Sequence, residues 1–293
     1  MSGAVPAFDL AEFKRGLSGP TMLGRRTDHH DSVTSTMTLA DERVRAEGGA
    51  AHGSVIVADM QTVGLGRRGR SWQSGPLGNL YFSLIWAPPA LAAGAGVGVA
   101  FAEMAKLNLA AGVAVVGASR AVGITSTRIK WPNDVWGGPA GAERKLSGTL
   151  LDFDGRSSAV LGVGINVLQD LSSNATATSL ASLAASGAAD APPISREAVL
   201  ATFCNEVQRL MLLPTAEVLA EYAEHDLLRG RTIRVHHKTR EEDHPDDFDA
   251  EALGVDGQGM LRVRRLDGNR AESALSGEEV SIGVGPPPAK QEL

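Results

Sequence analysis

The sequence Asp59-Met-Gln-Thr-Val-Gly-Leu-Gly-Arg-Arg-Gly-Arg-Ser-Trp72 lies between two short stretches rich in β-branched and aromatic residues. These stretches, residues 52–58 and 79–86, have the composition of β-strands, so the segment between them is predicted to be a long loop. Glycine permits close approach of a ligand to the backbone, and guanidinium groups pair with carboxylates and phosphates. The composition therefore favours a loop that wraps an anionic ligand, with a solvated basic turn as the alternative.

Three strands separated by short turns are predicted in the middle of the chain. They cover residues 125–131, 145–153 and 158–167, and a glycine-rich turn at 137–144 joins the first two. Strands joined by short turns pair in the antiparallel direction. With a buried apolar helix predicted over residues 97–112, the fold class is α/β, of the α+β kind: a mixed, mainly antiparallel sheet flanked by helices.

Two amphipathic helices are predicted to follow. Ser195 starts the first, in which apolar residues recur at helical spacing, and Thr215 caps the second, which is predicted to run through Leu228. Cys204, inside the first helix, is interpreted as a packing residue because no histidine or acidic partner pattern surrounds it.

The chain changes character at Gly230. Short strands alternate with Gly/Asp turns from there on, which predicts a small β-barrel. The predicted strands are 232–235, 260–264 and 279–282. The acidic insertion at residues 240–249 is predicted to be an exposed loop, and residues 286–293 are predicted to be a disordered tail.

The composition limits the kinds of partner. The 293-residue chain has 28 Lys and Arg against 34 Asp and Glu, and this net charge of −6 argues against non-specific binding to DNA or an anionic membrane. Residues 71–102 are uncharged, but Gly and Pro interrupt them, so no run of about 20 apolar residues remains to span a bilayer. Residues 1–12 lack the pattern of a signal peptide. Cys204 is the only cysteine, which fits a reducing cytosol.

Four further stretches stand in a fixed order around the Gly/Arg loop. They are Asp31-Ser-Val-Thr-Ser-Thr-Met37, Lys130-Trp-Pro-Asn-Asp-Val135, Lys145-Leu-Ser-Gly-Thr-Leu-Leu-Asp152 and Gly162-Val-Gly-Ile-Asn-Val167. In order and spacing they resemble the motifs of biotin protein ligases, the enzymes that attach biotin to a lysine of carrier domains. The resemblance extends from about Thr34 to Ile282.

The resemblance implies a division into domains. Residues 28–228 would form a class II synthetase-like catalytic domain that binds biotin and ATP, and residues 229–285 an SH3-like β-barrel, followed by the tail. Residues 1–27 would be an N-terminal extension with one short helix. Some biotin protein ligases carry an N-terminal winged helix-turn-helix that represses transcription, and this extension is too short for one. The chain therefore resembles the form that lacks a DNA-binding domain.

The reaction that the resemblance implies has two steps. The carboxylate of biotin attacks the α-phosphate of ATP, which gives biotinyl-5′-AMP and pyrophosphate. A lysine amine of the carrier domain then displaces AMP. The first step brings two anions together, so cations must neutralise them, and Mg²⁺ would bridge the phosphate oxygens.

The resemblance also implies residue roles. Lys145 would meet the biotin carboxylate and the α-phosphate, Arg67 would hold the phosphates, and Asp134 would be an anchor near the acceptor lysine or the metal. The residues implied to bind biotin or the adenylate are Ser35, Thr36, Met37, Gln61, Gly64, Leu65, Gly66, Arg67, Arg70, Trp72, Lys145, Gly148, Gly162 and Asn166.

Several of these residues have a specific expected contact. Ser35 and Thr36 would hold the ureido ring together with Gln61, and they also stand where they could cap a helix, a role compatible with binding. Gly148 and Gly162 would allow close backbone approach. No metal held by protein side chains is expected, because adjacent His residues diverge on a strand, and the histidines are interpreted as solvated surface residues.

One position departs from the family pattern. Biotin protein ligases usually have an arginine where this chain has Leu65, and that arginine helps to order the loop over the adenylate. The loop of this chain is therefore expected to retain the intermediate less tightly.

Two alternatives remain open. Lipoate ligases and octanoyltransferases share the fold, although the Lys130–Asp134 stretch and the C-terminal barrel favour biotin. A biotin-binding regulator without ligase activity is the other alternative. The expected partner is the biotin carboxyl carrier domain of an acetyl- or acyl-CoA carboxylase, with no DNA or membrane partner. The protein is expected to be cytoplasmic, as a monomer or a homodimer.

Overall fold

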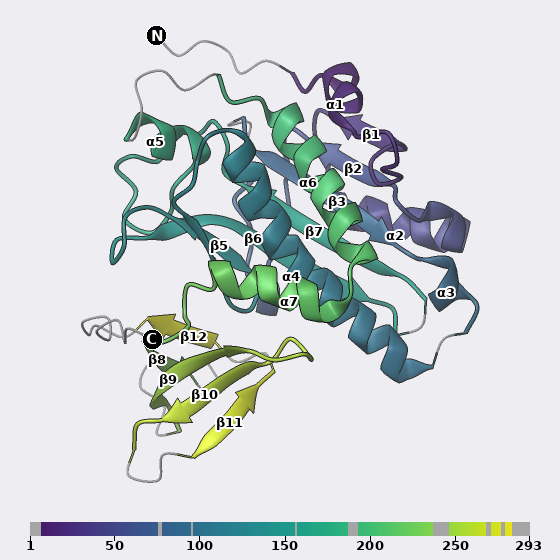
Figure 1. Ribbon diagram of the computed structural model, residues 1–293. Helices are drawn as coiled ribbons and strands as arrows, with labels where there is room; N and C mark the ends of the chain where they lie inside the picture. The colour runs from purple at the N-terminus through teal and green to yellow at the C-terminus, as the bar shows by residue number, and fades with distance from the viewer. Residues whose placement is uncertain are drawn as a thin grey trace.

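The computed structural model describes residues 7–75, 78–94, 96–155, 157–186, 193–236, 246–267, 271–276 and 279–282. Its larger part is built on a seven-stranded sheet in the order β1-β2-β3-β7-β6-β5-β4 (Figure 1). The strands are β1 (Thr27–His30), β2 (Val55–Ala58), β3 (Leu80–Trp86), β4 (Thr127–Lys130), β5 (Asp134–Gly137), β6 (Arg144–Phe153) and β7 (Ala159–Ile165).

The direction of strand pairing agrees with the sequence prediction. Only the edge pair β1 and β2 is parallel, and each of the other neighbours in this sheet is antiparallel. The short β4–β5 turn and the β6–β7 hairpin impose this direction, because antiparallel strands can be joined by a few residues. The prediction of a mixed, mainly antiparallel sheet flanked by helices is confirmed.

Helices cover both faces of the sheet and complete the core. They are α1 (Leu10–Gly16), α2 (Thr36–Glu47), α3 (Pro89–Ala92), α4 (Val97–Ala121), α5 (Leu180–Ala185), α6 (Arg196–Leu212) and α7 (Thr215–His225), with the 3-10 turns η1 (Gly48–Ala51) and η2 (Arg67–Gly69). Val55 and Val57 of β2 belong to the large core shared with α4 and α6, whereas Ile56 packs on the opposite face with Met37 and Ala40 of α2. A strand covered on both faces is apolar throughout.

Helix α4 is the central helix of the core and runs across the sheet beside α6 and α7 (Figure 1). It is longer than the predicted 97–112, because its apolar composition continues to Ala121. It is long and apolar enough to cross a membrane, but 67% of its most apolar 18-residue window is buried inside the protein. This burial is that of a core helix.

The other helices confirm some predictions and correct others. Ser195 caps α6, where its hydroxyl accepts from the backbone N–H of Ala198 at 3.1 Å. The prediction that the next helix runs through Leu228 is wrong. Helix α7 ends at His225, because the backbone becomes extended at Asp226. The N–H of Leu227 then donates to the carbonyl of Ile129 in β4 at 2.8 Å instead of to the helix. Helix α5 was not predicted, since its Ala/Ser sequence has no clear apolar period.

The C-terminal part is a five-stranded antiparallel sheet in the order β11-β10-β9-β8-β12. Its strands are β8 (Thr232–His236), β9 (Phe248–Val255), β10 (Leu261–Arg265), β11 (Glu272–Leu275) and β12 (Glu279–Ile282). In the part of the chain that the structure describes, β11 and β12 do not pair with each other, so closure into a barrel stays a prediction. Residues 237–245 of the acidic region and the tail 286–293 lie outside the described residues, but Phe248 and Asp249 begin β9 rather than continuing a loop.

The interpretation of the histidines as surface residues is wrong for two of them. The ring of His52 packs edge-on against Trp86 with centroids 4.9 Å apart, and its Nδ1 accepts from the N–H of Ala87. His225 is buried at the end of α7. Burial lowers the pKa of both rings because it disfavours the charged form. Cys204 is fully buried, which raises the pKa of its thiol to about 12 and agrees with a packing role.

Asp226 marks the passage from α7 to the C-terminal sheet. Its Oδ1 accepts from the N–H of Leu228 at 2.9 Å, whereas its Oδ2 is buried without a hydrogen-bond partner. Burial raises the pKa of this carboxyl, and nearby backbone N–H groups offset only part of the effect. The folded protein therefore binds a proton at Asp226 more readily than the unfolded chain does. Stability from this group is present at low pH and is lost as the pH rises through the raised pKa.

We expect Asp226→Asn to raise the melting temperature by a few degrees at pH 7, because it keeps the acceptor oxygen and removes the buried charge. The gain should vanish below about pH 4, where the Asp226 carboxyl is protonated in both the folded protein and the unfolded chain. Thermal melts followed by circular dichroism between pH 3 and pH 8 measure this. Asp170→Asn is the control of opposite sign, since hydrogen bonds from Ser172 lower the pKa of that exposed carboxyl. An unchanged or lower melting temperature for Asp226→Asn at pH 7 would contradict the conclusion that the buried charge of Asp226 destabilises the folded protein.

Candidate active site

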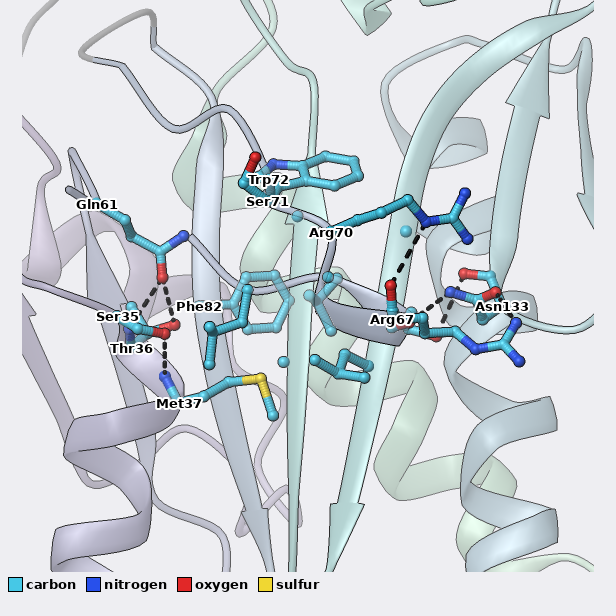
Figure 2. A pocket seen from close by; sticks show the side chains of 18 of the residues that line it. Ser35, Thr36, Met37, Gln61, Arg67, Arg70, Ser71, Trp72, Phe82 and Asn133 are labelled. Atoms are coloured by element: carbon cyan, nitrogen blue, oxygen red, sulfur yellow. Dashed lines mark hydrogen bonds between the residues drawn. The ribbon is translucent and has the colours of Figure 1, made fainter. Parts of the chain in front are cut away.

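A pocket lies on the sheet between the start of α2 and the β4–β5 turn, under the loop that joins β2 to β3 (Figure 2). Its volume is about 140 Å³. All the residues predicted to form the site line this pocket except Gly64 and Asn166. The pocket has a polar end, an apolar middle and a charged end.

The polar end is a hydrogen-bond network around Gln61. Its Oε1 accepts from the N–H of Thr36 at 2.9 Å and from the Thr36 hydroxyl at 3.2 Å, and its Nε2 donates to the Ser74 hydroxyl at 2.9 Å. The Thr36 hydroxyl also lies 2.8 Å from that of Ser83. Ser35 caps α2, with its hydroxyl accepting from the N–H of Met37. The capping role expected for Ser35 is therefore present, and the network fixes how the Gln61 amide is oriented.

The middle of the pocket is apolar and narrow. Met37, Phe82, Leu150 and Val163 line it, and the Met37 side chain points across it in Figure 2. A Cβ placed on Gly162 would lie 2.6 Å from Met37 Sδ. Gly162 therefore makes room for a protein side chain, which differs from its predicted role of admitting a ligand close to the backbone.

The charged end holds Lys145 and Asp134 on neighbouring strands. The Nζ of Lys145 lies 2.8 Å from Oδ1 of Asp134, and 5.2 Å from the centre of the Trp72 ring. The Lys145 side chain is 34% exposed. Lys145 therefore has a carboxylate partner within the protein, because β5 brings Asp134 to it. Although it is paired with Asp134, the Lys145 side chain still lines the pocket and is partly exposed there.

The Gly/Arg loop folds back on itself. Leu65 pairs with Ser71, the N–H of Gly66 donates to the carbonyl of Arg70 at 2.8 Å, and the N–H of Trp72 donates to the carbonyl of Gly64 at 2.9 Å. A Cβ on Gly64 would lie 2.3 Å from the carbonyl oxygen of Trp72. Gly64 is therefore needed for the loop's own backbone contact.

Two side chains bring this loop down onto the sheet. The Trp72 indole lies against Gly148 and Gly164, where an added Cβ would be 3.0 Å and 2.5 Å from ring atoms. The NH1 group of Arg67 donates to the Oδ1 of Asn133, in the β4–β5 turn, at 2.9 Å (Figure 2). The loop thus covers the pocket, with Arg67 and Arg70 among the lining residues.

The sequence analysis did not single out all the residues that make these contacts, and one residue that it did single out, Asn166, lies away from the pocket. Ser83 and Gly164 belong to the contacts above, and their position beside apolar or predicted residues along the strands was the available signal. Asn133, which follows the end of a predicted strand together with Asp134, was expected to face a site but was given no role. Asn166 does not line the pocket. It is buried beyond the end of β7, where its Nδ2 donates to the carbonyl of Thr178 at 3.0 Å.

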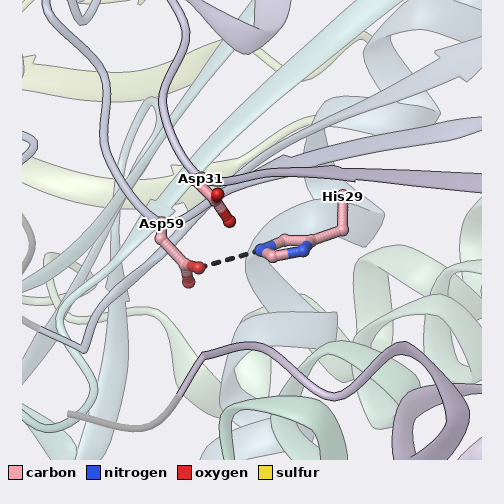
Figure 3. A group of neighbouring side chains, drawn as sticks. All are labelled: His29, Asp31 and Asp59. Atoms are coloured by element: carbon pink, nitrogen blue, oxygen red, sulfur yellow. Dashed lines mark hydrogen bonds and ion pairs between the residues drawn. The ribbon is translucent and has the colours of Figure 1, made fainter.

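A second group of polar side chains lies outside the pocket. His29, Asp31 and Asp59 each place one possible ligand atom within 4.8 Å of the others (Figure 3). The His29 ring is 2.9 Å from Asp59, and the other Asp59 oxygen accepts from buried Arg196 at 2.6 Å. These contacts tie the ends of β1 and β2 to the start of α6.

The residues that line the pocket all lie in a part of the chain that is similar to a known family. Residues 30–170 match the model of the biotin/lipoate A/B protein ligase family. This match covers just under half of the chain and includes every residue that lines the pocket.

Curated relatives are similar to this chain over about half of its length. The chain is 35% identical over 160 residues to the bifunctional ligase/repressor BirA of Bacillus subtilis, a match that covers 54% of this chain and 45% of the relative. It is 37% identical over 149 residues to the biotin–[acetyl-CoA-carboxylase] ligase of Mycobacterium tuberculosis, which covers 47% of this chain and 49% of the relative. The chain spans about half the length of the curated relatives it matches.

Solved structures share the fold over most of the chain. Biotin protein ligase from Aquifex aeolicus in complex with biotin and ATP superposes with a TM-score of 0.66 at 23% identity, covering 88% of this chain and 100% of that one. Biotin protein ligase from Leishmania major in complex with biotinyl-5-AMP gives a TM-score of 0.54 at 23% identity, with 86% and 99% coverage. Coverage of 88% and 86% of this chain is more than residues 1–228 alone could supply, so the likeness extends into the C-terminal part.

The contact between Trp72 and Gly164 gives a test of the closed loop. We expect Gly164→Ala to displace the indole, because its Cβ would overlap the ring. The indole N–H resonance of Trp72, assigned with Trp72→Phe, should then shift in a ¹⁵N–¹H spectrum. Gly98→Ala is the control, since a Cβ there meets nothing within 4 Å. An unmoved Trp72 resonance in Gly164→Ala would show that the indole does not rest on β7.

Proposed function

We propose that the protein is an ATP-dependent biotin protein ligase, which forms biotinyl-5′-AMP and transfers biotin to a lysine of a carboxylase carrier domain. The observation that carries the proposal is the order in which polar, apolar and cationic side chains follow one another along the pocket. A hydrogen-bonding end, an apolar middle and a cationic end lie under a single Gly/Arg loop. Biotin has the same order, with a ureido ring, a thioether ring and chain, and a carboxylate.

The polar end suits the ureido group. Ser35, Thr36 and Gln61 offer hydroxyl and amide groups whose orientations are fixed by the network around them. A buried polar group of a ligand must find partners of this kind, since leaving it unpaired costs about 1–3 kcal/mol. Met37 and Phe82 would then cover the apolar rings.

The cationic end suits the first chemical step. Lys145, with Arg67 and Arg70 above it, would neutralise the carboxylate and the α-phosphate as they approach. In the structure Lys145 is held toward the pocket by Asp134. In the second step, Asp134 would orient the acceptor amine as it attacks the adenylate and displaces AMP. Both groups are proposed as catalytic, together with Arg67.

Mg²⁺ fits this end of the pocket. Asp134 is the carboxylate among the described lining residues, and Mg²⁺ is commonly held by one or two carboxylates together with substrate phosphates. When bound, the ion would neutralise phosphate charge. Asp134 and the phosphate oxygens would hold it.

The wider proposal follows the same family. The acceptor would be the biotin carboxyl carrier domain of an acetyl- or acyl-CoA carboxylase, and the protein would act in the cytoplasm as a monomer or homodimer, without a DNA or membrane partner. Residues 28–228 would be the catalytic domain, between the extension 1–27 and the C-terminal domain 229–285. The name of the M. tuberculosis relative supports the acceptor.

The family model also includes lipoate ligases, so lipoate is the competing substrate. Pyrophosphate release from ATP, measured with biotin and with lipoate, separates the two activities. Release with biotin alone supports the proposal, and release with lipoate alone overturns it. A biotin-binding regulator without ligase activity would bind biotin and release no pyrophosphate.

Lys145→Gln tests the catalytic role directly. We expect biotin adenylation to slow by about 10²-fold or more, the scale of losing one electrostatic stabiliser. The melting temperature should change little, because Lys145 is part-exposed. Lys14→Gln, which removes an exposed lysine of α1, should adenylate at the parent rate. If Lys145→Gln forms biotinyl-AMP as fast as the parent, the proposed placement of the reaction is wrong.

Leu65 tests retention of the intermediate. Leu65 lines the pocket and is 45% exposed, so an arginine fits there and would add a cation over the adenylate. We expect Leu65→Arg to lengthen the lifetime of bound biotinyl-AMP, measured by its release from the protein. Val63→Arg, an exposed position on the same loop, controls for added charge. Equal lifetimes for Leu65→Arg and the parent would make Leu65 a neutral variant.

A further inference from the structure

The polar side chains of His29, Asp31 and Asp59 come from the ends of two parallel strands. The register of β1 and β2 places His29 beside Val57, so both strands end at the same edge of the sheet. Asp31 follows β1 directly and Asp59 follows β2 directly. Asp31 lies two residues beyond His29, a spacing that puts two side chains on the same face of an extended chain. The parallel pairing therefore brings three candidate metal ligands together from two separate segments.

A buried arginine orients Asp59. The Oδ1 of this carboxylate accepts from NH1 of Arg196 at 2.6 Å, and the Arg196 side chain is 4% exposed. The Oδ2 of Asp59 lies 2.9 Å from Nε2 of His29 (Figure 3). Hydrogen bonds from the surroundings fix the direction of a carboxylate that binds a metal. One oxygen of Asp59 is thus held by α6, while the other faces the imidazole.

An aromatic side chain packs against this group. The ring of buried Phe8 lies 5.5 Å from the ring of His29, and 5.8 Å from the guanidinium carbon of Arg196. An apolar shell lowers the local dielectric and so strengthens the attraction between a cation and carboxylates. Asp31 is exposed, which leaves a path by which an ion can enter from solvent.

The distances suit a first-row transition metal. Imidazole nitrogens and carboxylate oxygens bind Zn²⁺ at about 2.0–2.2 Å, so two ligand atoms on one ion are at most about 4.4 Å apart. The atoms of His29 and Asp59 are within this limit at 2.9 Å. All three ligand atoms lie within 4.8 Å of one another, so a small rotation of exposed Asp31 completes the set. An imidazole among the ligands favours Zn²⁺ over Mg²⁺, which takes oxygen ligands.

We propose that His29, Asp31 and Asp59 bind a divalent transition-metal ion of the Zn²⁺ class. None of the three residues lines the pocket, so this site is distinct from the one proposed for ATP and Mg²⁺. The sequence argument against a metal concerned neighbouring histidines, whereas these ligands are one histidine and two carboxylates from two segments. The ion would tie the ends of β1 and β2 together two residues before Gln61, which gives it a structural role beside the polar end of the pocket.

Titration calorimetry of the untagged full chain with ZnCl₂ tests the proposal without biotin or ATP. We expect one Zn²⁺ to bind tightly per chain, and an excess of MgCl₂ to leave that binding unchanged. Asp31→Asn and His29→Gln each remove one ligand. Each should weaken Zn²⁺ binding at least about tenfold, since even the loss of an outer contact to a metal ligand costs about 10–100-fold.

His30→Gln is the matched control, because it removes the neighbouring imidazole, which is not part of the group. It should bind Zn²⁺ as the parent does. An ion that binds the folded protein raises its melting temperature. Zn²⁺ should therefore raise the melting temperature of the parent and of His30→Gln more than that of Asp31→Asn. Asp31 is exposed, so without Zn²⁺ its variant should melt with the parent.

Parental Zn²⁺ affinity in Asp31→Asn or in His29→Gln would overturn the proposal, as would an equal loss in His30→Gln or no binding by the parent. If His29→Gln does not fold, the exposed Asp31→Asn variant decides. These measurements use no substrate, so they stand apart from the test of the proposed function. If Zn²⁺ binds as expected while biotin supports no pyrophosphate release, the proposed function fails and the metal site stands.

Discussion

Two glycines directly opposite each other on β6 and β7 make this site possible. Gly148 and Gly164 are partners in the strand register, and together they leave a flat area of backbone in the middle of the sheet. The Trp72 indole fills that area, and Gly162 on the same strand as Gly164 does the same for Met37. Side chains at these positions would keep the loop and α2 away from the sheet. The pocket is the space that remains between Trp72 and Met37.

The same strand register sets the charges of the site. Asp134 is paired with Gly148, and a shift in the register between Val135 and Trp136 brings Lys145 opposite Trp136. The carboxylate and the ammonium therefore meet at 2.8 Å although no simple alternation of strand residues would place them together. At the other end, hydrogen bonds run from Thr36 through Gln61 and Ser74 to the carbonyl of Trp72. Both ends of the pocket are thus connected to the loop that covers it.

Local patterns in the sequence account for much of this, and contacts between distant segments account for the rest. The strands and most helices follow from apolar period, turn residues and caps, as at Ser195. The need for glycine at position 64 could be predicted, but its cause, the Trp72 carbonyl, depends on how the loop folds back. The pairing of Lys145 with Asp134 depends on an irregular register that no composition reveals. The side chain of Asn166 donates to the carbonyl of Thr178 instead of lining the pocket, and a strand pattern does not specify that direction.

Trp131 belongs to the core of the C-terminal sheet, although it precedes Asn133 by only two residues. Its indole is 2% exposed among Ile233, Val235 and Leu261, and its Nε1 donates to the carbonyl of Gly259 at 2.9 Å. A chain cut after Leu228 would expose about 150–250 Å² of indole surface, worth about 4–6 kcal/mol at about 25 cal/mol per Å². A shortened protein would thus present an aromatic surface to solvent beside its own pocket. The C-terminal sheet therefore buries an aromatic side chain that belongs to the larger part of the protein.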